Sequence, residues 1–286
     1  MTATYRRMIL LCVIFILSVS STYSSSISMI EIPISFDHAN LPMVELVIGK
    51  HRGKFYVDTG AKGLHLPKLT ADTIHGLKLT GRTVKSIDLA GRVREDAEFM
   101  IPELQMNGML FRNVTGQYLS DWGVGKSEFQ LPVIGLDVLQ QKELVIDFPR
   151  KKILMSDTPI AFDALYHSTQ DLQFTREDEG LVISAHIGNQ DWPFVLDCAA
   201  SISIIKASAT INNDLIAPCA FNLPGGRCEA VSGHVDCGEK MITLQLIRMP
   251  LPDQFKPMGV IGHDFFSRCA LYLSKDHDIM KIACTN

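Results

Sequence analysis

Short apolar runs separated by glycine and polar turns dominate the chain. Around residue 50 the sequence reads ELVIGKHRGKFYVDTGAKGLHLP, and around residue 189 it reads ISAHIGNQDWPFVLDCAASISII. Each segment predicts a strand, a tight turn at a glycine, and a second apolar strand that ends on an acid, because Val, Ile, Leu and Phe favour strands and glycine favours turns. The pattern therefore predicts a mostly β protein.

The two segments match each other at a constant offset of 139 residues, which pairs Asp58 with Asp197 and Phe55 with Phe194. Two further matches follow in the same order. LAGRV at 89–93 is similar to VSGHV at 231–235, and PVIGLDVL at 132–139 is similar to GVIGHDFF at 259–266. Three matches in register argue for an internal duplication. We predict an all-β fold of two lobes, with short helices at 135–142 and 264–268.

The N-terminal region has the layout of a secretory signal peptide. Arg6 and Arg7 precede a twelve-residue apolar run at 8–19, and a serine-rich stretch follows at 18–28. Twelve residues are too few to span a bilayer, which needs about 20, so an uncleaved membrane anchor is the alternative that we disfavour. We expect a signal peptide at 1–26, an N-terminal lobe at 27–157, a linker at 158–171 and a C-terminal lobe at 172–286, in an exported (periplasmic or secreted) protein with no membrane span once the signal is removed.

Composition excludes several other classes. The chain has 286 residues, 47% hydrophobic and 20% charged, which rules out intrinsic disorder. The net charge of −4 would become −6 on removal of the signal, so nucleic acid is not an expected partner. Neither an HExxH nor a GxSxG motif is present. The acidic run at 176–179 predicts a solvated turn.

A set of motifs in the first half resembles one lobe of an aspartic protease of the pepsin and retropepsin group. An apolar strand leads into Asp58-Thr59-Gly60-Ala61, a glycine hairpin follows about 33 residues later at Gly91, and Ile134-Gly135-x-Asp137 comes after it. The set is repeated in the second half, so the resemblance covers residues 30–286. It implies a two-lobed acid-protease fold in one monomeric chain, an aspartic-type endopeptidase with a peptide or protein substrate, and no cofactor or metal.

The resemblance makes Asp58 and Asp197 the candidate catalytic pair. Two carboxyls a few ångströms apart cannot both ionise cheaply, so they share one proton. The ionised member takes a proton from water, and the protonated member polarises the peptide carbonyl. Thr59, Gly60 and Cys198 are the expected supports of the pair. The glycine hairpins centred on Gly91 and Gly233 are the candidate flaps over bound peptide, an ordinary turn being the alternative for each.

The second motif, Asp197-Cys198-Ala199, departs from the Asp-Thr/Ser-Gly pattern of the family. A thiol is a weaker donor than the expected hydroxyl. Ala199 adds a methyl group, which would cost about 1–2 kcal/mol if a left-handed backbone were needed there. The alternative function is therefore a catalytically inactive, aspartic-protease-like module that binds peptides without cleaving them.

Six cysteines follow the signal, all in the second half, and an even number in an exported chain predicts disulfides. Cys269 and Cys284 bracket the last hairpin, and Cys228 and Cys237 bracket Ser232-Gly233, so we expect these two pairs. Cys198 then remains for Cys219, with a free, buried Cys198 as the alternative. A zinc site made of Cys219, Cys228, His234 and Cys237 is a further alternative that the exported context disfavours.

Overall fold

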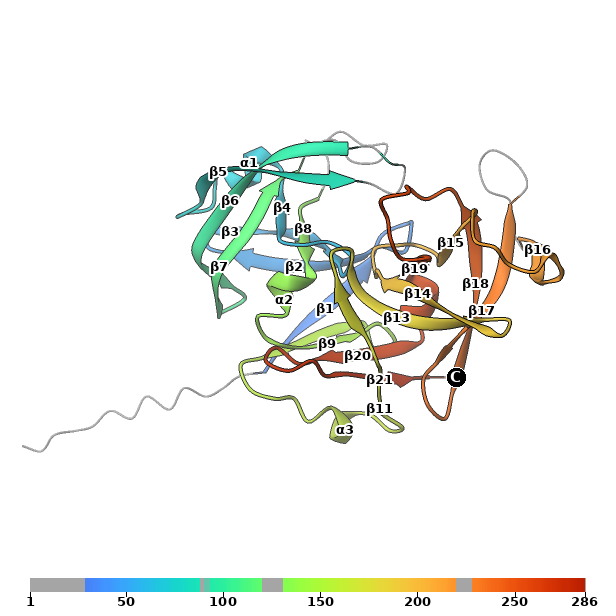
Figure 1. Cartoon of the computed structure of the whole chain (residues 1–286). Helices are drawn as coiled ribbons and strands as arrows, with labels where there is room; N and C mark the ends of the chain where they lie inside the picture. The colour runs from blue at the N-terminus through green and yellow to red at the C-terminus, as the bar shows by residue number, and fades with distance from the viewer. Residues whose placement is uncertain (1–28, 88–90, 92, 120–130, 220–227, 286) are drawn as a thin grey trace, which may run out of the picture.

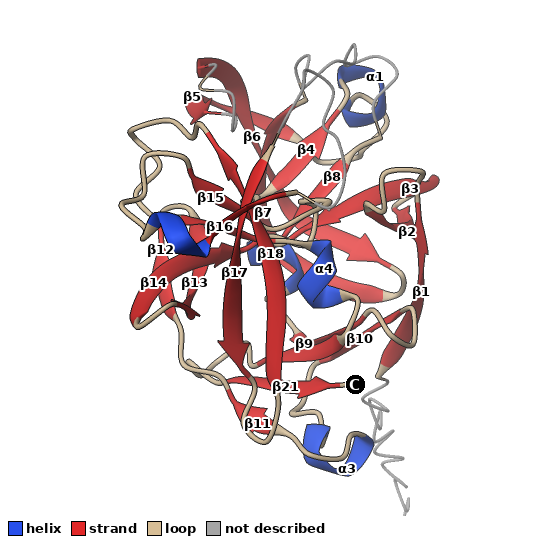
Figure 2. Cartoon of the chain, turned by 90° about the vertical axis from the view of Figure 1, so that its right-hand side faces the viewer, coloured by secondary structure: helices blue, strands red, loops and turns tan. Residues whose placement is uncertain are grey.

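The computed structural model describes residues 29–87, 91, 93–119, 131–219 and 228–285. Strands make up most of this part of the chain, with a few short helices between them (Figure 2). The predicted all-β, two-lobed fold is confirmed. The predicted signal peptide lies outside the described residues. No helix in the described ranges is long and apolar enough to cross a membrane.

The N-terminal lobe is built from eight strands that run in the spatial order β1-β2-β3-β8-β4-β7-β6-β5. Helix α1 (Lys68–Ala71) follows β4, and α2 (Leu136–Leu139) follows β8. The strands are β1 (Ile30–Phe36), β2 (Pro42–Ile48), β3 (His51–Asp58), β4 (Leu64–Leu66), β5 (Lys78–Ile87), β6 (Val93–Met106), β7 (Met109–Tyr118) and β8 (Val133–Gly135).

The C-terminal lobe has eight strands in the order β12-β13-β14-β19-β15-β18-β17-β16, which is the order of the first lobe strand for strand. The 3-10 helix η2 (Asn213–Leu215) precedes β16, and α4 (His263–Phe266) follows β19. The strands are β12 (Thr175–Glu177), β13 (Gly180–Ile187), β14 (Gln190–Leu196), β15 (Ile204–Lys206), β16 (Ile216–Pro218), β17 (Glu229–Asp236), β18 (Met241–Met249) and β19 (Gly259–Ile261).

Strands from both halves of the chain form a shared sheet beneath the two lobes (Figure 1). Its order is β11-β21-β20-β9-β10, and β10 continues into β1 of the N-terminal lobe. Helix α3 (Phe162–Leu165) covers one face of it together with Tyr166. The strands are β9 (Glu143–Asp147), β10 (Lys152–Ser156), β11 (Gln170–Asp171), β20 (Cys269–Leu273) and β21 (Met280–Cys284).

Burial explains why these segments fold as they do. In β2, buried Val44, Leu46 and Ile48 alternate with exposed Glu45 and Val47, because one face packs on the core and the other faces solvent. In contrast, all residues of β9 and β20 are buried, since the shared sheet is covered on both faces.

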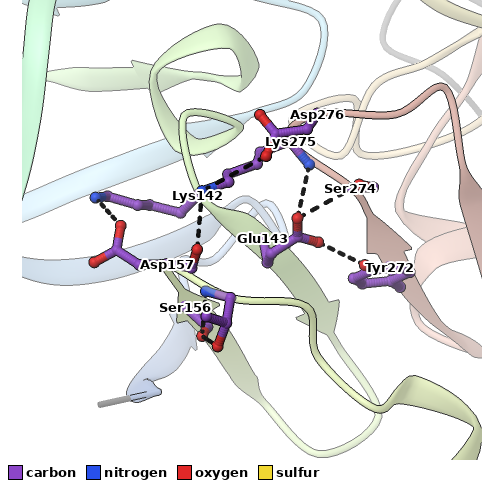
Figure 3. A network of polar contacts seen from close by, with 9 residues as sticks. Lys142, Glu143, Ser156, Asp157, Tyr272, Ser274, Lys275 and Asp276 are labelled. Carbon is purple, nitrogen blue, oxygen red and sulfur yellow. Dashed lines mark hydrogen bonds and ion pairs between the residues drawn. The ribbon is translucent and has the colours of Figure 1, made fainter. Parts of the chain in front are cut away.

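A buried polar network ties β9 to β20 inside the shared sheet (Figure 3). Glu143 is only 2% exposed, and its carboxylate accepts hydrogen bonds from the Tyr272 hydroxyl at 2.5 Å and from the Ser274 hydroxyl at 3.4 Å. Burial and the hydrogen bond to Glu143 raise the pKa of Tyr272 to about 12, so its hydroxyl remains a donor at physiological pH. The two halves of the chain are thus joined by specific polar contacts as well as by strand pairing.

The cysteine pairing differs in part from the expectation. Cys269 and Cys284 form a disulfide as predicted, because they are direct partners across β20 and β21. The predicted Cys228–Cys237 and Cys198–Cys219 pairs are wrong: Cys228 bonds to Cys219, and both Cys198 and Cys237 are free and buried. The reason is that Cys219 and Cys228 directly follow and precede the paired strands β16 and β17. The alternative zinc set is excluded, because two of its four ligands are joined in this disulfide.

Candidate active site

Asp58 and Asp197 stand at equivalent ends of two buried strands. Asp58 is the last residue of β3, which runs parallel to β8, and it lies opposite Gly135. Asp197 directly follows β14, which runs parallel to β19, and its N–H donates to the Ile261 carbonyl at 3.0 Å. The side chains of Phe55, Val57, Phe194 and Leu196 are all fully buried. Each acid is therefore carried by a strand that the core holds rigidly.

Glycines at the start of the two IGxD elements allow the chain to cross closely behind each acid. A Cβ on Gly135 would lie 2.6 Å from the Ala61 carbonyl oxygen, and a Cβ on Gly262 would lie 2.6 Å from the Ala200 carbonyl oxygen. Only glycine fits at such distances. The Asp137 carboxylate then accepts the Gly63 N–H at 2.5 Å, which fixes the loop that follows Asp58.

The two acid-bearing loops interlock beneath the carboxyls. The Thr59 hydroxyl donates to the Leu196 carbonyl at 2.8 Å and accepts from the Cys198 N–H at 2.9 Å. The Cys198 thiol in turn donates to the Val57 carbonyl, with a sulfur–oxygen distance of 3.3 Å. Burial, followed by the nearby acids, raises the pKa of Cys198 well above its usual value, so the thiol stays protonated and able to donate. Cys198 thus takes the bracing position that a threonine occupies in the first loop.

The carboxyls of Asp58 and Asp197 lie close enough at the seam between the lobes to interact electrostatically. Each accepts a backbone N–H two residues on, at 2.8 Å, from Gly60 and Ala199 respectively. Burial and then the negative charge of Asp197 raise the pKa of Asp58 well above its usual value, and burial also raises the pKa of Asp197. Both residues keep partial exposure to solvent. The arrangement can therefore hold one shared proton within reach of a water molecule.

The backbone angles and the free space at Gly60 and Ala199 decide whether each position tolerates a side chain. Neither residue has positive φ, so the backbone strain considered for Ala199 does not arise. The close approach is real, however: a Cβ on Gly60 would lie 3.0 Å from Cγ of Asp197. A methyl group at residue 60 would therefore require the opposite acid to shift by a few tenths of an ångström.

The two candidate flap glycines lie in unlike positions. Gly91 has φ of +79° and lies between β5 and β6, where its Cβ would be 3.7 Å from Cγ of Pro252 in the other lobe. Residues 88–90 and 92 of this hairpin lie outside the described residues. Gly233 is not at a hairpin tip, which corrects the prediction: it pairs with Leu244 in the middle of β17, where a Cβ would lie 2.6 Å from the Leu246 side chain. A close packing contact, and not a turn, explains this glycine.

One neighbour of the pair was not predicted as part of the site. The acidic turn at 177–180 lies against the Asp58 loop, since a Cβ on Gly180 would be 3.5 Å from the Thr59 carbonyl oxygen. Asp178 lies 3.8 Å from the Lys62 ammonium, and Glu179 accepts the Lys256 N–H at 3.3 Å. The repeat contained a signal for this placement, because the turn precedes β13 just as residues 37–41 precede β2.

Comparisons with known proteins agree on the fold. No family model matches the sequence, and no curated protein matches it significantly. An aspartic proteinase from Irpex lacteus has a similar structure, with a TM-score of 0.59, 10% identity, and coverage of 91% of this chain and 98% of that chain. Conglutin gamma, a basic 7S globulin from lupine seeds, gives a TM-score of 0.59 at 9% identity, covering 91% and 95%. Basic 7S globulin from soybean gives 0.57 at 9%, covering 91% and 96%. The chain therefore has the two-lobed, pepsin-like fold that these proteins share.

Proposed function

We propose that the protein is an exported aspartic endopeptidase in which Asp58 and Asp197 activate water. The observation that carries the proposal is the contact between two carboxyls at the lobe seam, each held at the end of a buried strand. The raised pKa values of both acids support a pair that keeps one proton above the pH at which a free carboxyl would lose it.

The proposed reaction needs no covalent intermediate. The ionised carboxylate takes a proton from water, and the resulting oxygen nucleophile attacks the peptide carbonyl carbon. The protonated carboxyl donates to the carbonyl oxygen, and a proton then reaches the departing nitrogen as the C–N bond breaks. Thr59 and Cys198 hold the two acids in register, and Gly60 leaves room for Asp197. The hairpin at Gly91 would close over an extended peptide.

Export is part of the proposal and is supported by the cysteines. The Cys219–Cys228 and Cys269–Cys284 disulfides persist most readily in oxidising compartments. The duplication of an ancestral lobe is likewise proposed, and the identical strand order of the two lobes supports it. The predicted lobe boundaries remain predictions, as does the monomeric state.

A second candidate function is peptide binding without cleavage. It is favoured by Ala199, which carries a methyl group at the position equivalent to Gly60. The structural neighbours are compatible with both candidates, because one is an aspartic proteinase and two are named as globulins.

The deciding experiment is digestion of an unfolded, labelled protein over a pH series. The wild type is compared with Asp58→Asn and Asp197→Asn, and with Asp72→Asn as a control that removes an exposed carboxylate outside both motifs. We expect cleavage by the wild type and the control, and a loss of at least about a thousandfold in both dyad variants. Cleavage that survives in Asp58→Asn would refute the peptidase. Saturable peptide binding by a wild type that does not cleave would establish the second function instead.

A further inference from the structure

The two acid-bearing loops share one hydrogen-bonding frame. Gly60 donates its N–H to Oδ1 of Asp58 at 2.8 Å, and Ala199 donates its N–H to Oδ1 of Asp197 at 2.8 Å. The Ala61 and Ala200 N–H groups each donate to the carbonyl of the acid in the same loop. Gly60 and Ala199 are therefore equivalent positions on the two sides of the seam.

This equivalence shows where the Ala199 methyl points. A methyl built on Gly60 would lie 3.0 Å from Cγ and 3.1 Å from Oδ2 of Asp197, the acid of the opposite loop. The equivalence of the two loops therefore predicts that the methyl of Ala199 is directed at the carboxyl of Asp58. The two acids would then have different neighbours, a bare Cα beside Asp197 and a methyl group beside Asp58.

A methyl group against a carboxyl excludes water from that side. A carboxylate loses hydration there while a neutral carboxyl loses much less, so the contact favours the protonated form. The charged and titratable groups around Asp58 do not offset this effect. They are the acid Asp197 and the neutral thiol of Cys198. Lys62, four residues after Asp58, has its ammonium 3.8 Å from Asp178 on the acidic turn.

We propose that the Ala199 methyl places the shared proton on Asp58 and leaves Asp197 as the ionised base that activates water. The proposal rests on the peptidase function and adds an assignment of roles within the pair. Ala199 acts through Asp58 and is therefore a positioning residue.

The test follows the two carboxyls directly by NMR of protein labelled with ¹³C at Asp Cγ. The signals are assigned with Asp58→Asn and Asp197→Asn, and titrated in the wild type, Ala199→Gly and Gly60→Ala. In the wild type we expect Asp58 to keep its proton to a higher pH than Asp197 does. Ala199→Gly should lower the proton affinity of Asp58 by about tenfold, and the alkaline limb of kcat/KM should move to lower pH by a similar amount. Gly60→Ala should instead raise the proton affinity of Asp197.

Each outcome decides the proposal. A wild type in which Asp197 keeps the proton to higher pH would overturn it, even if Ala199→Gly did not fold. An unchanged Asp58 titration in a folded Ala199→Gly variant would overturn it as well. The NMR result does not depend on turnover, so the two proposals can fail separately. If the protein does not cleave and Asp58 holds the proton, the peptidase proposal is rejected and the proton assignment stands. If the protein cleaves and Asp197 holds the proton, the proton assignment is rejected and the peptidase proposal stands.

Discussion

The interlock beneath the carboxyls offers the sharpest test of how the two lobes are held in register. Thr59 is 1% exposed, and its hydroxyl serves two backbone groups of the other lobe, the Leu196 carbonyl and the Cys198 N–H. Thr59→Val keeps the shape of the side chain and removes both hydrogen bonds. The substitution therefore isolates the polar part of the interlock from its packing.

The expected loss can be worked from these two bonds. A buried backbone group left without a partner costs about 1–3 kcal/mol, and two such groups are created. We expect Thr59→Val to lower the free energy of unfolding by about 2–6 kcal/mol, which at about 2 °C per kcal/mol for a chain of this size lowers Tm by about 4–12 °C. The carboxyls would also lose their register, so kcat should fall more than KM rises.

Cys198→Ser is the matched control on the other side of the seam. It keeps a donor for the Val57 carbonyl, so the expected loss is about 1 kcal/mol or less. Both variants can be followed by calorimetry and by fluorescence of the two tryptophans. A Tm for Thr59→Val within about 1 °C of the wild type would refute the reasoning. A greater loss in Cys198→Ser than in Thr59→Val would do so too.

Two further predictions concern titratable groups. Because the folded state raises the pKa of Asp58, it binds the proton more tightly than the unfolded chain, and stability falls as pH rises from the unfolded value through the raised one. Asp58→Asn should therefore be more stable than the wild type at pH 8, with a smaller advantage at pH 4; an equal difference in Tm at the two pH values would contradict this. Burial raises the pKa of the Cys237 thiol to about 12. The Cys237 sulfur lies within 4.8 Å of the sulfurs of Cys269 and Cys284, so an ionised thiol could exchange with their disulfide. The folded protein should thus resist iodoacetamide at pH 8 and retain the Cys269–Cys284 bond in peptide mapping, whereas rapid alkylation or an exchanged disulfide would count against a buried, protonated thiol.

Local pattern was sufficient to predict the elements that carry the acids. The matched segments around Asp58 and Asp197 are strands as expected, and the helices expected at 135–142 and 264–268 are present as the shorter α2 and α4. Strand periodicity and turn glycines are local properties, so a single sequence records them. The pairing of Cys269 with Cys284 was predictable for the same reason, because one hairpin brings them together.

Errors arose where the outcome depends on distant contacts. Gly233 resembles a turn glycine in sequence, but it is required by packing against Leu246 on the neighbouring strand. Cys228 lies at similar sequence distance from Cys219 and Cys237, and only the pairing of β16 with β17 selects Cys219. The acidic turn at 177–180 is solvated as expected, with Glu177 and Asp178 exposed, but nothing in its own residues records that Gly180 lies beside Thr59.

The most distant contact of all supports the site from below. Strand β20 pairs with β9, so residues at 270–273 are hydrogen-bonded to residues at 144–147, more than 120 positions earlier. Glu143 reinforces this junction through Tyr272 and Ser274 (Figure 3). The shared sheet contains strands from both halves of the chain, so neither lobe can form it alone. The Thr59 hydroxyl likewise needs the Leu196 carbonyl and the Cys198 N–H of the other lobe. We expect the pairing of Asp58 with Asp197 and the pairing of β9 with β20 both to form late in folding, because each closes a loop of more than 120 residues, which is entropically costly before the contacts compensate for it.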